Sequence, residues 1–127
     1  MMTPTEHPNV TLARKMNDAM ASGDMQTAAD CLTDDIVWHS IGQAEPARGK
    51  GELQASMGAM ADTTITWETH DVLANDEHII GIGTATAVRG DETFTYRTAE
   101  IYHVRDGQIS ERWAFSDDTK AITDFFG

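Results

Sequence analysis

The first half of the chain carries apolar residues at helical spacing, and this pattern predicts three helices. Their apolar positions are, in order, Leu12, Met16, Ala19 and Met20; Met25, Ala28, Ala29 and Leu32; and Leu53, Met57 and Met60. Ser22-Gly23 ends the first helix, and Asp24 is suited to cap the second. Asp34-Asp35 is expected to end the second helix, so a short strand is predicted at residues 36–39, before a loop at 42–51.

Strand patterns dominate the second half of the chain. Four strands are predicted, at residues 63–74, 78–88, 93–104 and 109–116, and a last short helix carries Ile122, Phe125 and Phe126. The turns between the strands fall at Asn75-Asp76, Arg89-Gly90-Asp91 and Asp106-Gly107. Helices followed by an antiparallel meander indicate an α+β fold with the helices on one face of the sheet.

The length of 127 residues fits one hydrophobic core. Residues 1–8 are expected to form a loose tail and residues 9–127 a single domain. No apolar run approaches the roughly 20 residues that a membrane-spanning helix needs. Cys31 is the only cysteine and cannot form an internal disulfide, so a buried role and a cytoplasmic location are expected.

The formal net charge of −12 argues against nucleic acid or an anionic membrane as a partner. Both would require clustered lysines and arginines, whereas the nine basic residues are scattered. The five histidines show no spacing typical of a metal site, and no phosphate-binding or dinucleotide-binding motif is present. No metal or cofactor is therefore expected.

The hairpin around Asp106-Gly107 is rich in groups that can move protons. These groups are Glu100, Tyr102, His103, Arg112 and Asp117. Strand alternation places Glu100 and Tyr102 on one face and His103 on the other, unless a bulge re-aims one of them. The apolar character of Tyr102 favours the Glu100 face as the inner one, which would leave His103 on the convex side.

Four segments carry a family resemblance through their order and spacing. They are residues 20–25, residues 32–39 with Gly49-Lys50-Gly51, residues 70–78, and residues 103–113 ending at Asp117. From about Ala13 onward the chain resembles the nuclear transport factor 2-like superfamily, closest to its SnoaL-like and ketosteroid-isomerase-like branch. The resemblance implies a cone-shaped curved antiparallel sheet, closed by N-terminal helices around an apolar pocket, which is a cystatin-like α+β barrel.

The resemblance also implies acid–base catalysis by cavity side chains, usually without a cofactor, and homodimers formed through the convex face. It identifies His39, Glu100 and Asp117 as catalytic candidates. His39 takes the place of the general base, which an imidazole can be near neutral pH. Glu100 takes the place of a protonated acid that donates a hydrogen bond to an oxyanion. Asp117, together with His103, resembles the pair that SnoaL-like cyclases use, with the aspartate as base.

Each catalytic candidate also has a structural interpretation. His39 could be a rim histidine that binds a loop. Glu100 could pair with Arg112 or Arg97 across the strands, and Asp117 could cap the last helix.

Further residues are expected around the pocket. They are Met16, Trp38, Tyr102, His103, Arg112 and Ser116. Met16 stands where the isomerase has its second oxyanion donor, a tyrosine, which argues against steroid isomerisation. Arg112 could hold Glu100 or Asp117 ionised, could bind an acidic substrate, or could form a surface ion pair. Trp38 is more typical of a core or an interface.

Two functions remain open. One is a SnoaL-like enzyme that uses cofactor-free acid–base catalysis on an apolar carbonyl compound or epoxide, as an isomerase, cyclase, dehydratase or hydrolase. Epoxide hydrolysis ranks lower because Arg97-Thr98-Ala99 lacks the expected Arg-x-Asp spacing. The other is a noncatalytic ligand-binding or dimeric interaction module on the same fold. The enzyme hypothesis requires His39, Glu100 and Asp117 to share one cavity.

Overall fold

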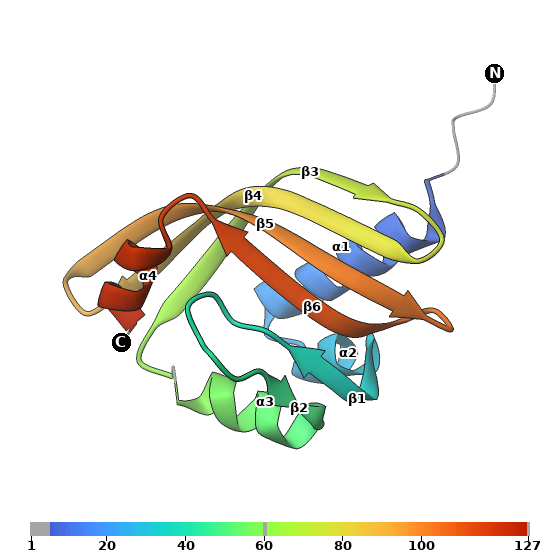
Figure 1. The fold of residues 1–127 in the computed structure, drawn as a ribbon, viewed down its shortest axis with the longest axis horizontal. Helices are drawn as coiled ribbons and strands as arrows, with labels where there is room; N and C mark the ends of the chain where they lie inside the picture. The colour runs from blue at the N-terminus through green and yellow to red at the C-terminus, as the bar shows by residue number, and fades with distance from the viewer. Residues whose placement is uncertain (1–5, 60, 127) are drawn as a thin grey trace.

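The structure is a computed structural model that describes residues 6–59 and 61–126 (Figure 1). Its elements are α1 (Pro8–Ser22), α2 (Met25–Asp30), β1 (Leu32–Trp38), β2 (Ala47–Arg48), α3 (Gly49–Gly58), β3 (Thr64–Ala74), β4 (His78–Arg89), β5 (Glu92–Arg105), β6 (Gln108–Ser116) and α4 (Thr119–Phe126). Residues 1–5 of the expected tail and Met60 of the third helix lie outside the described residues. No helix among the described residues is both long and apolar enough to span a bilayer.

The first helix follows the sequence pattern closely. Nδ1 of His7 accepts a hydrogen bond from the backbone N–H of Asn9 just before the helix, and Pro8 occupies the first turn. Gly23 ends α1 in the left-handed conformation, with φ of 80°, and its N–H donates to carbonyls of the last turn. Val10, Ala13, Met16 and Ala19 form the buried side of the helix.

The six strands form one curved sheet in the order β2-β1-β6-β5-β4-β3. Strands β3 to β6 form the predicted antiparallel meander, and the α+β class is confirmed. The pair β1–β6 is parallel, so the sheet as a whole is mixed. Helices α1 and α3 lie on one side of the sheet, as Figure 1 shows.

The boundaries differ from the prediction around β1. The strand begins at Leu32, because Leu32 and Ile36 reach the core while Asp34 and Asp35 between them face solvent. The acidic pair therefore lies within a strand and does not end a helix. The predicted loop at residues 42–51 also contains β2 and the start of α3.

The core lies between the helices and the sheet face that we call the inner face. It consists of Ala13, Met16, Cys31, Leu32, Ile36, Leu53, Ile79, Tyr102 and Ile109. Ile79 and Tyr102 are register partners on β4 and β5, and Tyr102 is in turn opposite Arg112 on β6. Arg112 is opposite Trp38 on β1, so the inner face continues across four strands.

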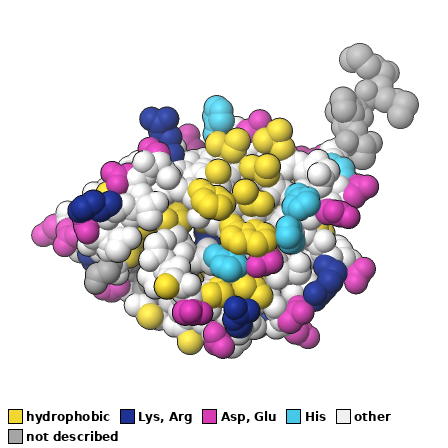
Figure 2. Space-filling model, in the orientation of Figure 1, with side chains coloured by type: hydrophobic (Ala, Val, Ile, Leu, Met, Phe, Trp, Pro, Cys, Tyr) yellow, Lys and Arg dark blue, Asp and Glu magenta, His cyan; other side chains and the backbone are white. Residues whose placement is uncertain are grey.

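No helix formed by the described residues covers the opposite sheet face, here called the outer face. Its side chains on β4, β5 and β6 are His78, Ile80, Ile82, Ile101, His103, Glu111, Trp113 and Phe115. Figure 2 shows apolar side chains gathered on this side of the molecule, with histidines and an acidic side chain among them.

Two irregularities determine which residues face which way. In β6, Val104 is opposite Ile109 and His103 is opposite Glu111, so Ser110 is one extra residue in the strand. Because of this bulge, Ile109 and Arg112 share the inner face although they are three positions apart. A second register shift lies between Thr69 and Asp71 of β3.

Candidate functional site

Glu100 forms the centre of a polar group on the inner face. It lies in β5 between two small residues, Gly81 of β4 and Ala114 of β6. One carboxylate oxygen accepts a hydrogen bond from Nη2 of Arg112, and the other accepts one from the Tyr102 hydroxyl. The Glu100 and Arg112 side chains are only 17% and 11% exposed, so their ion pair is largely shielded from water.

Arg112 is held by the last residue of β1, Trp38, and by the residue that follows it, His39. Its Nη1 donates to the backbone carbonyl of His39 at 3.0 Å, and its guanidinium lies 4.5 Å from the centre of the Trp38 ring. The Nε–H of Arg112 is buried and has no hydrogen-bond partner among the described residues. A buried donor without a partner is uncommon, and a bound ligand or water is one physical reason for it.

Tyr102 is a hydrogen-bond donor in this arrangement. Its side chain is buried, and burial followed by the charge of Glu100 raises the pKa of the phenol well above its usual range. Tyr96, six residues earlier on the same strand, has its pKa raised for the same two reasons. Tyr102 therefore keeps its proton and fixes the orientation of the Glu100 carboxylate.

The inner face has unfilled space beside Glu100. A Cβ atom added at Gly81, directly opposite Glu100, would meet no heavy atom within 4 Å. Thr98 lies on the same face two residues before Glu100, and its buried hydroxyl has no hydrogen-bond partner among the described residues. Thr98 was missed in the sequence, although alternation back from Glu100 would have found it.

His39 lies on the outer face. Its Nε2 is 2.8 Å from Oε2 of Glu111, and its ring stacks on Trp113 with centroids 5.3 Å apart. His103 contacts the edge of the same tryptophan, and its Nδ1 is 3.9 Å from Oε1 of Glu111. His78 in turn meets His103 edge-on at 4.7 Å. Glu111 links the imidazoles of His39 and His103. Its position in the sequence gave no signal of that role.

Asp117 is separated from the other two catalytic candidates. It is exposed, its Oδ1 accepts from the backbone N–H of Arg97 at 3.3 Å, and its carboxylate is 3.9 Å from the Arg97 side chain. The cap of α4 is the next residue, Asp118, which accepts from the N–H of Ala121. The structure therefore does not bring Asp117 or the His39 ring to the inner face that holds Glu100. The predicted catalytic site made of His39, Glu100 and Asp117 in one cavity is wrong, and any enzyme proposal has to be built on the residues around Glu100.

The expected pocket residues are divided in a similar way. Trp38, Tyr102 and Arg112 surround Glu100, whereas His103 is on the outer face. Met16 is fully buried in the core cluster. Ser116 lies at the end of β6 opposite Thr98, and its hydroxyl accepts from the N–H of Asp118.

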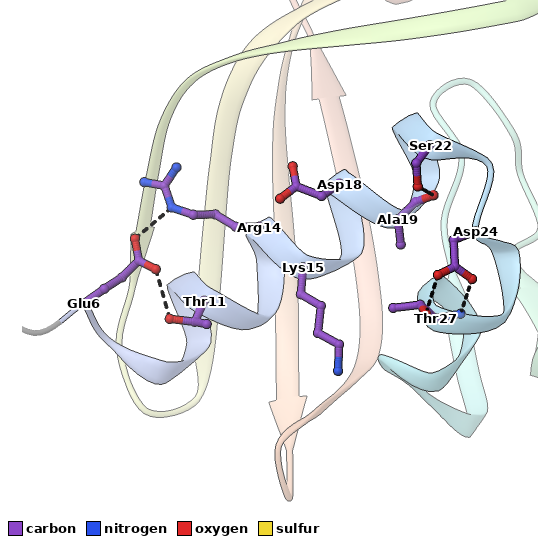
Figure 3. Close-up of a pocket in the computed structure, with 9 residues that line it drawn as sticks. All are labelled: Glu6, Thr11, Arg14, Lys15, Asp18, Ala19, Ser22, Asp24 and Thr27. Atoms are coloured by element: carbon purple, nitrogen blue, oxygen red, sulfur yellow. Dashed lines mark hydrogen bonds and ion pairs between the residues drawn. The ribbon is translucent and has the colours of Figure 1, made fainter.

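Two surface hollows are lined by neither Glu100, Tyr102 nor Arg112. One, of about 710 Å³, runs along α1 and α2, where several of its polar side chains bond to one another, as in Glu6 with Arg14 and Asp24 with Thr27 (Figure 3). The other, of about 260 Å³, is lined by residues 97–99 and 115–117 at the end of the β5–β6 pair. Within residues 6–59 and 61–126, no three His, Cys, Asp or Glu side chains are grouped to hold a metal ion.

Comparison with known proteins supports one family. Residues 13–112 match the family model described as a SnoaL-like domain. No curated protein matches this sequence closely enough to count as a relative.

Solved structures with the same fold come from several sources. Bal32a, from a soil-derived mobile gene cassette, is 24% identical, with a TM-score of 0.86 over 94% of this chain and 97% of that one. IdmH from Streptomyces antibioticus, a proposed polyketide cyclase, is 21% identical, with a TM-score of 0.72 over 96% and 100%. An LEH-like epoxide hydrolase from M. tuberculosis is 18% identical, with a TM-score of 0.77 over 94% and 86%. At these identities the likeness establishes the fold, which is that of nuclear transport factor 2-like proteins.

Proposed function

Because this chain belongs to the SnoaL-like domain family, we propose that it is a small-molecule enzyme whose acid–base site is the Glu100–Arg112–Tyr102 group. The substrate would be an apolar carbonyl compound or an epoxide. The observation that carries the proposal is a shielded carboxylate–guanidinium pair beside unfilled space, in which the Arg112 Nε–H has no partner among the described residues.

Each residue of the group has a distinct role in this proposal. Glu100 uses one of its remaining lone pairs as the general base, since a carboxylate has about four acceptor sites and two are occupied. Arg112 stabilises the negative charge that develops on the substrate oxygen. Tyr102 holds the carboxylate in place. Glu100 would not act as a hydrogen-bond donor here, because both of its oxygens already accept.

Proton exchange on a simple ketone tests the base. 2-Tetralone has acidic protons next to its carbonyl, and their replacement by deuterium in D₂O can be followed by ¹H NMR. Glu100→Gln is expected to slow the catalysed exchange about 100-fold, because the amide cannot accept the proton. Glu92→Gln, at the exposed start of the same strand, is the matched control and should exchange like the wild type.

A second assay, hydrolysis of styrene oxide, distinguishes carbonyl from epoxide chemistry. Binding of either probe without turnover in the wild type would contradict the enzyme and favour a ligand-binding module. That alternative has one supporting observation, namely that Glu100 is already engaged at both oxygens.

We also propose that two copies of the chain associate through the outer face. Leu73, Ile80, Ile82 and Phe115 expose large apolar side chains there, and these side chains are gathered on one face instead of being scattered singly (Figure 2). In a twofold interface, the patch of one copy packs against the same patch of the other copy. Like charges in the patch would then face each other, so the patch should carry little charge. Its acidic side chains are Glu111, which faces two imidazoles, and Asp71, which lies on the edge strand β3 beside Ile82; the chain as a whole has a net charge of −12.

Placing a charge in this patch should prevent the association. Phe115→Asp is expected to weaken the dimer at least tenfold, measured by sedimentation velocity over a concentration series. Met25→Asp, which changes an equally exposed apolar residue on α2, should leave the dimer unchanged. A wild-type protein that stays monomeric at high concentration would contradict the proposal.

A further inference from the structure

His39 contacts three consecutive residues of β6, of which Arg112 points to the inner face and Glu111 and Trp113 point to the outer face. It lies just after the end of β1, where the chain leaves the sheet. Its backbone N–H donates to the carbonyl of Arg112 at 2.9 Å, and its own carbonyl accepts from Nη1 of Arg112 at 3.0 Å. Its ring is on the other side, bonded to Glu111 and stacked on Trp113.

The ring contacts add to the backbone hydrogen bonds that hold His39 against β6. The β1–β6 ladder ends at Trp38, and within residues 6–59 and 61–126 His39 is held by its bonds to Arg112 and by the two ring contacts. Its carbonyl is one of only two hydrogen-bond partners of the Arg112 side chain within the described part of the chain; the other is Glu100. Displacing the ring would therefore weaken the support of the guanidinium.

We infer that His39 is a positioning residue, which couples the charge state of the outer face to the placement of Arg112 on the inner face. Imidazoles change charge between about pH 5 and 8. A positive charge on His39 strengthens its attraction to Glu111 and tightens the contact that holds the His39 backbone. The groups that share this charge environment are Glu111 of β6, His103 of β5 and, beyond it, His78 of β4.

The coupling can be measured without a substrate. In ¹⁵N-labelled protein, the buried Arg112 Nε–H and the His39 ring each give a signal that can be followed between pH 5 and 8. The Arg112 signal is expected to shift with the same midpoint as the His39 ring. In His39→Gln, whose amide can still donate to Glu111 but does not titrate, this shift should disappear. His70→Gln, at the exposed bulge of β3, should retain it.

Two results would overturn the inference. One is an Arg112 signal in the wild type that stays constant while the His39 ring titrates, which does not depend on how any variant folds. The other is a shift that persists unchanged in His39→Gln. An effect of the His39 charge on catalysis rests on the proposed function. The coupling between the His39 charge and the placement of Arg112 does not. An inactive protein in which Arg112 follows His39 would therefore reject the enzyme and keep this inference.

Discussion

Replacing Arg112 with leucine is expected to lower the free energy of unfolding by about 3–5 kcal/mol, because it leaves the Glu100 carboxylate shielded from water without its cation. Urea unfolding followed by far-UV circular dichroism, at one fixed protein concentration, measures the loss. Proton exchange on 2-tetralone should fall to the background rate in the same variant, since the group that stabilises the substrate oxygen is gone.

A double variant separates the charge effect from the loss of packing. Glu100→Gln combined with Arg112→Leu removes both charges and keeps an amide oxygen to accept from Tyr102. It should recover most of the stability lost by Arg112→Leu alone, since replacing a buried pair with neutral groups is often tolerated. A double variant as unstable as the single one would show that Arg112 stabilises mainly through its contact with Trp38.

Gly83→Val is the second large effect, with an expected loss of about 3 kcal/mol. A Cβ at Gly83 would overlap the backbone carbonyl of Glu68 and approach Cζ2 of Trp67 to 2.7 Å. A backbone carbonyl in a paired strand cannot move aside without disturbing the β3–β4 ladder, which already shifts register at the next residues. Urea unfolding of the purified variant gives the size of the loss.

Gly81→Val is the matched control for this prediction. It lies two residues earlier on the same face of the same strand, where a Cβ meets nothing within 4 Å. Its cost should stay below about 1 kcal/mol, helped by the preference of valine for strands. Equal losses at the two positions would indicate a general need for glycine in β4 and not a local clash with β3.

Local signals in the sequence were sufficient for most of the fold. Asp106-Gly107 predicted the last hairpin, and both residues adopt positive φ values, 52° and 78°. Alternation correctly separated Tyr102 from His103, because a strand covered on one face exposes its residues in turn. The Ser22-Gly23 stop and the Asp24 cap were also confirmed, since capping depends on immediate neighbours.

Non-local pairing limited the rest. Asp34 and Asp35 resembled a helix end, but β1 is held by its parallel partner β6, about 75 positions away in the chain. The orientation of His39 and Asp117 could not be read by alternation because both residues follow a strand end. Glu111 was overlooked for a related reason: its importance comes from contacts with His39, just after β1, and with His103 of β5.

The single extra residue at Ser110 makes residue counting unreliable in comparisons with relatives. If a relative lacks this bulge, the residue aligned with Arg112 by distance from the turn points outward, and the one aligned with Glu111 or Trp113 points inward. Two sequences could then carry the same side chains with exchanged roles, or different side chains with the same role. Active-site assignments across this family should therefore be transferred by strand register, with the bulge located first.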